Sequence, residues 1–235
     1  MRKFILLIIL SLYCQGIAIA QEYRVFKGDT INRTDAKGQK QGAWKRYYDN
    51  DQLFSESMYK NNKAIGSTTM YYKTGEKQGV MVHDKDGKTS RMTSYWPNGK
   101  LKARGKYVNQ EKDSTWNYHY DTDTLMAIEN YKMGKEHGVW ILYYPDGKIS
   151  EETMWANGKK NGPCKKYFTS GSIKMSGNYK NDTFDGSLVH FHMNGKPFIK
   201  GTFVNGLKEG EWLYLSETGV KDSSDFYKRG TLQEK

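Results

Sequence analysis

The sequence predicts an all-β protein: an elongated single-layer antiparallel meander of about eight β-hairpin repeats of 24 residues, twisted into a trough. Three observations support this. Glycine, tyrosine and tryptophan recur with a fixed period, aromatic and β-branched residues lie between the glycines, and no stretch has helical periodicity. A constant period of this size is typical of repeat arrays whose terminal units act as caps.

The repeat is clearest in its glycines and aromatic residues. One column of the alignment holds six glycines, with Asp51 and Asp123 in its two gaps: Gly75, Gly99, Gly147, Gly171, Gly195 and Gly219. Eight residues later comes a second column, in which every residue except His83 is phenylalanine, tryptophan or tyrosine. Its members are Tyr59, His83, Tyr107, Tyr131, Trp155, Tyr179, Phe203 and Tyr227. The repeats therefore run from residue 42 to the C-terminus without insertion or deletion.

The segment Pro145-Asp146-Gly147 is a tight-turn sequence, and its place in the repeat predicts one β-hairpin per repeat. Proline presets φ at the first turn position, and glycine supplies a positive φ. We expect the loop to pair Tyr144 with Lys148 and Tyr143 with Ile149, and the sequence Asn157-Gly158 to begin the connection to the next hairpin.

Alternation along the strands predicts two different faces. It places Ile149, Glu151, Thr153 and Trp155 on one packed face, and Trp140 with Tyr144 on the other. Glycines that share a column within the second strand, Gly105, Gly177 and Gly201, predict that an aromatic ring from a neighbouring hairpin lies across the backbone. Six aromatic residues then become candidates for binding a partner: Trp44, Trp116, Trp140, Trp212, Tyr48 and Tyr144.

The N-terminus predicts export. Arg2 and Lys3 precede the apolar run Phe4–Leu12, and a small-x-small cleavage site ends at Ala20. We therefore expect a signal peptide over 1–20, a partial repeat or cap over 21–41, and one repeat domain over 42–235, in a protein exported to the periplasm, the cell surface or the medium. Removal of the signal peptide removes Cys14 and leaves Cys164, which stands in the tryptophan column and is expected to be a buried packing residue.

The net charge of +11 falls to about +9 without the signal peptide, and such a surface favours anionic partners. The lysines are spread along the chain rather than clustered, which favours the alternative of a merely solvated basic surface. Because an exported protein meets nucleic acid less often, no nucleic-acid partner is expected.

No catalytic or metal-binding set stands out. His190 and His192 share a strand face, but nothing nearby completes a tetrahedral set, and His192 occupies a tyrosine column. Asp121-Thr122-Asp123 resembles part of a calcium loop but lacks the later glutamate, so a polar hairpin turn is expected. The sequence predicts no enzyme and no cofactor.

The motif G-x-W-x-x-Y-Y-x-x-G-x-L, best seen at 138–149, 42–48 and 95–107, resembles the bacterial variant of the MORN (membrane occupation and recognition nexus) repeat and its YwqK-like antitoxin group. The resemblance implies a hairpin ribbon used for protein scaffolding and in some cases phospholipid binding. The unit 66–89 departs from the motif at Thr68, Lys77 and His83, and the unit 114–137 departs at Asp123, so we expect these units to bend the ribbon or to carry specificity.

Two functions fit these features. The first is a monomeric exported scaffold that binds another protein, as a toxin-neutralising partner in the sense of the antitoxin group. The alternative is an envelope-associated binder of anionic lipid headgroups or cell-wall glycan. Repeated tryptophan–tyrosine hairpins are also similar to choline-binding wall repeats, which form aromatic cages for a quaternary ammonium group.

Overall fold

The computed structural model describes residues 22–26 and 28–234, which contain strands, turns and bends but no helix. None of these residues therefore belongs to a helix that could cross a membrane. The predicted signal peptide lies outside the described residues. The strands are β1 (Arg24–Phe26), β2 (Asp29–Ile31), β3 (Arg33–Thr34), β4 (Lys40–Tyr47), β5 (Leu53–Lys60), β6 (Lys63–Tyr71), β7 (Lys77–His83), β8 (Thr89–Tyr95), β9 (Leu101–Val108), β10 (Glu111–His119), β11 (Leu125–Lys132), β12 (Lys135–Glu136), β13 (Gly138–Tyr143), β14 (Ile149–Ala156), β15 (Lys159–Tyr167), β16 (Ile173–Lys180), β17 (Thr183–Phe184), β18 (Gly186–Phe191), β19 (Pro197–Val204), β20 (Leu207–Leu215), β21 (Lys221–Lys228) and β22 (Thr231–Leu232).

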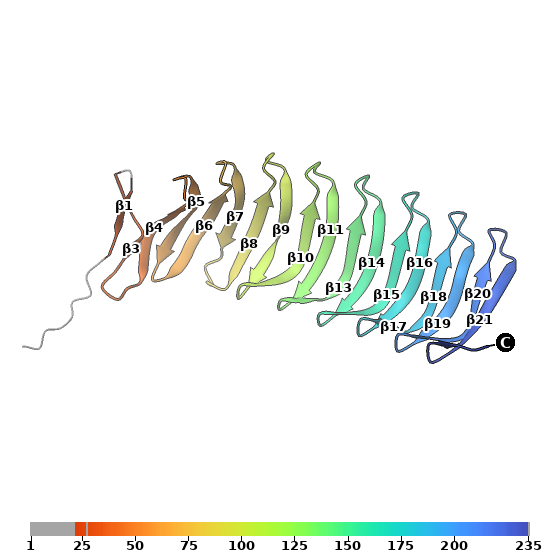
Figure 1. The fold of residues 1–235 in the computed structure, drawn as a ribbon. Helices are drawn as coiled ribbons and strands as arrows, with labels where there is room; N and C mark the ends of the chain where they lie inside the picture. The colour runs from red at the N-terminus through yellow and green to blue at the C-terminus, as the bar shows by residue number, and fades with distance from the viewer. Residues whose placement is uncertain (1–21, 27, 235) are drawn as a thin grey trace, which may run out of the picture.

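The strands form one long open antiparallel sheet. From β3 to β22 the sheet follows chain order, so each strand lies beside its neighbours in the sequence (Figure 1). The short strands β12 and β17 lie beside turns, where β11 also pairs with β13 and β16 with β18. A separate two-stranded sheet, β1–β2, precedes the ribbon. The predicted all-β hairpin meander is confirmed.

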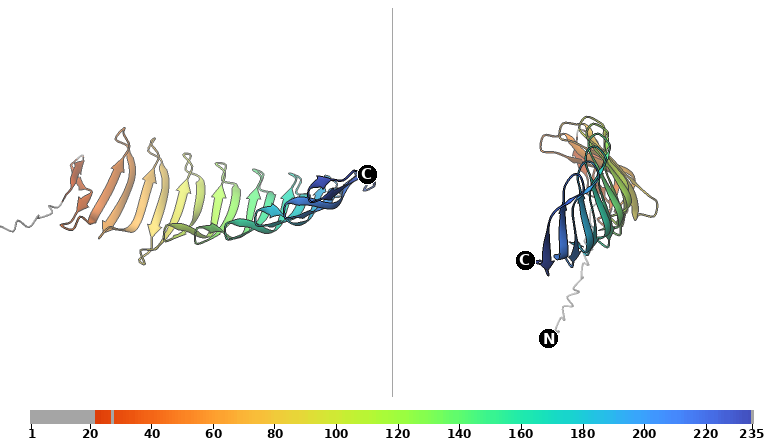
Figure 2. Two further views of the ribbon diagram at one scale, coloured as in Figure 1. Left: turned by 60° about the horizontal axis from the view of Figure 1, so that its bottom comes forward. Right: turned by 90° about the vertical axis from the view of Figure 1, so that its right-hand side faces the viewer.

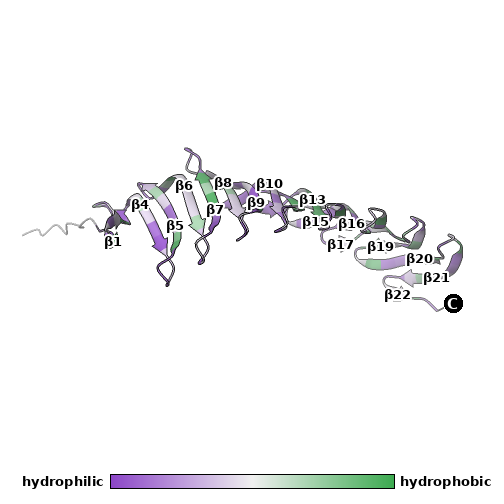
Figure 3. Cartoon of the chain, turned by 90° about the horizontal axis from the view of Figure 1, so that it is seen from above, coloured by the Kyte–Doolittle hydropathy of each residue, from purple (hydrophilic) through white to green (hydrophobic). Residues whose placement is uncertain are grey.

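The ribbon twists and curves along its length. Seen along the long axis, successive hairpins fan around it and form a curved layer (Figure 2). Hydrophobic and hydrophilic segments alternate along the ribbon, with no second layer over the sheet (Figure 3). Both edge strands, β3 and β22, have only two residues, and such short edges offer few free hydrogen-bonding groups to another chain.

Longer loops at one end of the strands form what we call the loop edge, which comprises 48–52 and its equivalents in every later repeat. In the loop after β13, the amide of Tyr144 donates to the carbonyl of Lys148 at 2.8 Å, and Tyr143 pairs with Ile149, as predicted. Gly147 has φ 86°, and the two aspartates in this column keep the same conformation, with φ 60° at Asp51 and 84° at Asp123. Aspartate tolerates this left-handed region better than most residues, which explains the two gaps in the glycine column.

Two-residue turns at the other end of the strands form the turn edge, which comprises 61–62, 109–110, 133–134, 157–158, 181–182, 205–206 and 229–230. At Asn157 and Gly158, φ is 53° and 84°. Positive φ at both central residues is the mark of a type I′ hairpin turn, whose twist matches that of the strands. The connection between repeats is therefore itself a hairpin, and the ladder continues without interruption.

The prediction that Trp140 lies on the face opposite Trp155 is wrong. The register shifts between Leu142 and Tyr143, because Tyr143 pairs with Ile149 whereas Leu142 pairs with Glu151. The extra residue is a β-bulge, and it reverses the alternation below the loop. Trp140 consequently pairs with Thr153 and its ring lies 4.9 Å from that of Trp155. Tyr143 and Ile149 lie on the other side, away from Glu151.

We call these sides the tryptophan face, which carries Trp140, Thr153 and Trp155, and the reverse face, which carries Tyr143, Ile149 and Glu152. The tryptophan face holds most of the buried side chains: Ala103, Trp116, Ala127, Thr153, Cys164, Met175, Leu188 and Trp212 are each at most 7% exposed. Cys164, Met175, Leu188 and Trp212 form one buried cluster, which confirms Cys164 as a packing residue, and burial raises the pKa of its thiol.

The glycine column lies directly under the rings, as predicted. A Cβ atom on Gly105 would be 2.1 Å from Cδ2 of Trp116, and one on Gly201 would be 2.3 Å from Cδ2 of Trp212. Both tryptophans are only 3% exposed. At Gly177 the position over the backbone is taken by Leu188 instead.

Candidate interaction surfaces

The predicted partner-binding tryptophans are held within the sheet. The indole N–H donates to a backbone carbonyl of the preceding strand in three cases: Trp44 to Arg33 at 3.2 Å, Trp116 to Lys106 at 3.1 Å and Trp140 to Asn130 at 2.9 Å. Trp44 and Trp140 are half-buried, while Trp116 and Trp212 are nearly inaccessible. Their contacts tie neighbouring strands together, and their role in partner binding stays a prediction.

Tyr48 and Tyr144 belong to a ladder that links successive repeats. Each hydroxyl donates to the carbonyl 23 residues later, Tyr48 to Tyr71 at 2.9 Å and Tyr144 to Tyr167 at 2.6 Å. The same link recurs along the column, made by Tyr72, Trp96, Tyr120 and His192. His192 thus replaces a ladder tyrosine, as its column predicted.

Lysine side chains extend over the rings of the tryptophan face. Lys40 Nζ lies 4.4 Å from the Trp44 ring centre and Lys208 Nζ 4.4 Å from that of Trp212, within cation–π range. Lys112 Nζ also donates to the Tyr118 hydroxyl at 2.6 Å. Burial and the charge of Glu129 raise the pKa of Tyr118, so the phenol stays protonated. These lysines cover the rings from solvent.

The reverse face carries a row of three shallow hollows at equivalent positions. The first lies beside Met58 with about 230 Å³, the second beside Lys106 with about 390 Å³, and the third beside Met154 with about 200 Å³. These three residues are 48 positions apart, so the hollows recur every second repeat. Four strands separate one hollow from the next, which corresponds to about 19 Å along the ribbon.

The hollows share a position but differ in chemistry. Their reverse-face linings are Ala43, Lys45, Glu56, Met58, Ser67 and Thr69 in the first, Arg91, Thr93, Arg104, Lys106, Thr115 and Asn117 in the second, and Val139, Glu152, Met154, Pro163 and Lys165 in the third. The first is mixed in charge, the second is basic and the third is largely apolar.

Ion pairs fix part of this pattern. In the second hollow Arg91 pairs with Asp84 at 2.6 Å and Lys106 with Asp113 at 3.3 Å. In the third, Val139 is 41% exposed. Sequence reasoning missed this surface, because its columns are the ones that vary most between repeats. The variation of these columns between repeats was the sequence signal that could have indicated this surface.

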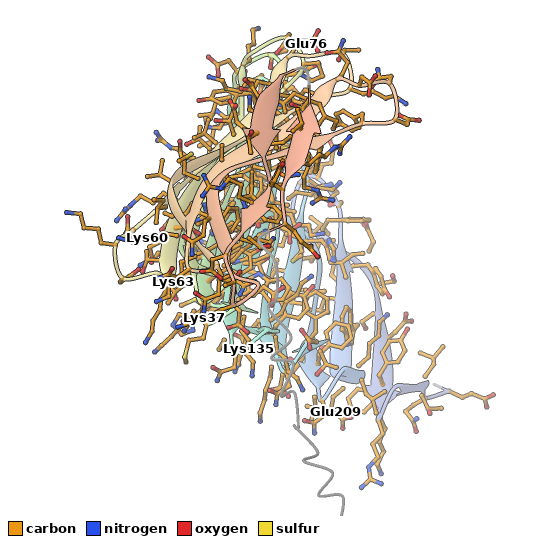
Figure 4. All side chains as sticks on the ribbon, turned by 90° about the vertical axis from the view of Figure 1, so that its left-hand side faces the viewer. Lys37, Lys60, Lys63, Glu76, Lys135 and Glu209 are labelled. Atoms are coloured by element: carbon orange, nitrogen blue, oxygen red, sulfur yellow. The ribbon has the colours of Figure 1, made fainter. Side chains whose placement is uncertain are left out.

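The turn edge is rich in lysine. Lys37, Lys60, Lys63 and Lys135 lie toward this end of the strands in Figure 4, and Glu76 lies at the loop edge. Other cations of the turn edge are Lys85, Lys88, Lys132, Lys159, Lys180, Lys228 and Arg229. Acidic side chains also lie along this border, among them Glu111, Glu136, Asp182 and Glu209, but cations outnumber them.

Residues 22–26 and 28–234 contain no group of three or more histidine, cysteine, aspartate or glutamate side chains that could hold a metal ion. The acidic pair at Asp121 and Asp123 is a hairpin turn, as predicted, in which the Asp123 amide donates to the carbonyl of Tyr120 at 3.0 Å.

The open hairpin ribbon, with its rings and hydroxyls committed to links between repeats, defines a repeat scaffold. Its segments 40–61, 88–109, 136–157 and 160–181 match the model of the MORN repeat variant family. MORN repeats are non-catalytic scaffold units that commonly bind protein or lipid.

Among curated proteins none matches this chain. Among solved structures, one chain in the crystal structure of TcdB2-TccC3-TEV is similar, with 13% identity, a TM-score of 0.19, and coverage of 84% of this chain and 14% of that one. This chain thus spans about a seventh of that protein's length, and a likeness of this degree supports no conclusion about fold or function.

Proposed function

We propose that this protein is an exported, non-catalytic repeat scaffold that binds one other protein across the hollows of the reverse face, as a toxin-neutralising partner. The observation that carries the proposal is the row of three equivalent hollows with three different linings.

The spacing of the hollows suits a folded protein better than a small molecule. Two intervals of about 19 Å place the outer hollows about 38 Å apart, which is the scale of a standard protein interface. The sheet holds the hollows in fixed register, so a partner meets mixed, basic and apolar contacts in a set order. Shape and charge matched in this way give specificity.

The apolar third hollow is the expected energetic centre. Met154 and Pro163 line it, and Val139 remains 41% exposed beside them. Apolar side chains that are exposed together and surrounded by charge are typical of protein-binding surfaces.

Affinity capture from the native envelope tests the proposal. The wild-type chain is expected to retain one specific protein, and Met154→Glu and Val139→Lys are expected to lose it. Matched controls are Met193→Glu and Val220→Lys, because Met193 and Val220 lie on the loop edge at 68% and 65% exposure. Equal capture by the hollow variants and the controls would contradict the proposal.

Two further measurements address export and neutralisation. N-terminal sequencing of the purified periplasmic or secreted protein is expected to begin near Gln21. Expression of the captured protein alone is expected to arrest growth, and co-expression of this chain to restore it. A chain that stays in the cytoplasm with an intact leader, or a harmless partner, would remove these parts of the proposal.

A second function is favoured by the lysine-rich turn edge, namely contact with an anionic envelope surface. Lysines beside a charged membrane or an acidic glycan contribute electrostatic attraction that salt weakens. Co-sedimentation with liposomes containing phosphatidylglycerol, or with peptidoglycan, is expected to fall as salt rises. Binding that ignores salt would exclude this function.

A further inference from the structure

The row of rings on the tryptophan face is interrupted at Thr68, and a cavity of about 450 Å³ lies beside His83, the hydrogen-bond partner of Thr68. It is lined by side chains from β5 to β8 and from the adjoining turns, among them Tyr59, Lys63, His83, Lys88 and Gln110. It lies on the side of the sheet away from the three reverse-face hollows.

Comparison with the unit 48 residues later explains the cavity. There Trp116 lies over the sheet, Tyr131 packs beside it and Lys112 covers both rings. The equivalent residues here are Thr68, His83 and Ala64. Three smaller side chains therefore leave open the space that an indole and a lysine stem fill in the other unit.

Hydrogen bonds behind the cavity hold its His83 ring in place. Thr68 Oγ1 lies 2.6 Å from Ser57 Oγ and 2.9 Å from His83 Nε2. Burial lowers the pKa of His83 below its usual 6.5, so the ring is neutral at pH 7. Ser90 is only 9% exposed and forms another part of the polar lining.

A different turn completes the cavity. The chain passes from β7 to β8 through a longer loop, 84–88, in which the amide of Asp84 donates to the carbonyl of Thr89 at 2.9 Å. This loop brings Gly87, at φ 67°, and Lys88 to the cavity, and the side chain of Lys63 lies against Gly87.

The cavity is positively charged and no carboxylate lines it. Lys63 and Lys88 form no ion pair with the residues that the structure describes. Asp84 is paired with Arg91, while the Asp86 carboxylate accepts from the backbone amides of Lys88 and Thr89 and from the Thr89 hydroxyl. Both carboxylates of the loop therefore already have partners, and the ammonium groups of Lys63 and Lys88 are available to a ligand.

We propose that this cavity binds an acidic sugar, a sugar ring that carries a carboxylate or phosphate group. Lys63 and Lys88 would bind the anionic group, with lysine acting as a point charge for an oxyanion. The side-chain amides of Asn62 and Gln110 and the hydroxyl of Ser90 offer partners for sugar hydroxyls, and the Tyr59 ring supplies an apolar wall. The volume lies in the range of small-molecule sites.

Isothermal titration calorimetry tests the proposal with four probes: galacturonate, glucose 6-phosphate, glucose and inorganic phosphate. The two acidic sugars are expected to bind at least tenfold more tightly than either glucose or inorganic phosphate. Polygalacturonate forms a further arm: tighter binding of the polymer indicates a glycan source, and preference for the monomer indicates a free metabolite. Absence of heat with both acidic sugars at millimolar concentration would overturn the proposal, as would equal binding of glucose.

A transplant variant provides the control for folding. Ser57→Gly, Ala64→Lys and Thr68→Trp together install the equivalents of Gly105, Lys112 and Trp116, which this sheet already accommodates. This variant is expected to fold with an unchanged or higher denaturation midpoint and to bind the acidic sugars at least tenfold more weakly.

Lysine substitutions provide the second control. The pair Lys63→Gln and Lys88→Gln is expected to lose at least tenfold in affinity for the acidic sugars. The pair Lys132→Gln and Lys135→Gln, at another turn of the same edge, is expected to bind as the wild type does. Full binding by the filled variant, or equal losses from both lysine pairs, would show that the cavity is not the site. Because these residues lie away from the reverse face, partner capture is expected to continue in all of these variants.

Discussion

Gly105 lies beneath the indole of Trp116, where a Cβ atom would be 2.1 Å from the ring. The same relationship joins Gly201 and Trp212, and both tryptophans are buried to 3% exposure. At Trp140 the position equivalent to Gly105 is occupied by Glu129, and the ring stays half-buried. A residue without a side chain in one strand thus lets the ring of the next strand reach the backbone.

Substitution of this glycine is expected to destabilise the ribbon. Gly105→Ala forces the Trp116 ring from its position, and overpacking of this kind costs about 1–3 kcal/mol. Gly177→Ala is the matched comparison, since its Cβ would meet a methyl carbon of Leu188 at 2.8 Å, a smaller group that moves more easily. Urea denaturation followed by circular dichroism measures both. A midpoint for Gly105→Ala as high as that for Gly177→Ala would contradict the argument.

Loss of one ladder hydroxyl is expected to weaken the link between two repeats. Tyr144→Phe removes the 2.6 Å hydrogen bond to the Tyr167 carbonyl, at a cost of about 0.5–1.5 kcal/mol. Tyr143→Phe, at the neighbouring residue on the reverse face, is the control and is expected to cost less. Amide hydrogen exchange near Tyr167 should accelerate only in the first variant, and equal exchange in both would show that the ladder is not stabilising.

Removal of Trp140 is expected to reduce stability rather than binding alone. Its ring packs 5.4 Å from that of Tyr131 and 4.9 Å from that of Trp155, and its N–H bonds to Asn130. Truncation of a large buried aromatic side chain costs about 3–5 kcal/mol, and a half-buried ring is expected at or below the lower end. If Trp140→Ala kept its denaturation midpoint and lost its partner, the assignment of this residue to partner binding would be correct after all.

Alkaline pH is expected to destabilise the protein through its tyrosines. Burial and the hydrogen bond to Glu152 raise the pKa of Tyr167 to about 12, and burial with Asp225 raises the pKa of Tyr214 to about 12. In the unfolded chain tyrosine titrates near 10, so between about pH 10 and 12 the unfolded state holds fewer protons than the folded state. The free energy of unfolding therefore falls as pH rises through this range.

Urea denaturation at pH 9 and at pH 11.5 measures this dependence. Tyr167→Phe removes one of the responsible groups, and Glu152→Gln removes the charge beside it, so each variant is expected to lose less stability on alkaline transfer than the wild type. An unchanged pH dependence in both variants would assign the effect to other groups.

Much of the fold could be predicted from the sequence because the repeat is exact in length. The glycine and aspartate column marks the loops, and the tight pairing of Tyr143 with Ile149 follows from Pro145-Asp146-Gly147. The bulge below each loop could not be predicted, since either register satisfies the turn. It moves Trp140 to the face of Trp155, and it changes which surface is free for a partner.

The interaction surfaces were less predictable for a related reason. The hydroxyl link from Tyr144 to Tyr167 depends on the position of the next hairpin, which the motif alone does not specify. The hollows beside Met58, Lys106 and Met154 lie in variable columns, so no motif marks them. For the cavity beside His83, the sequence offered only one indication, namely that Thr68 and His83 depart from the repeat motif.

The strict chain order of the sheet has an evolutionary consequence. Because the sheet from β3 to β22 follows chain order and its pairings join only strands that are next to each other or separated by a two-residue strand, a pair of repeats can be duplicated or deleted by unequal recombination without changing the order of the units on either side. A 48-residue block carries one complete hollow, so each such event would add one hollow to the reverse face or remove one from it.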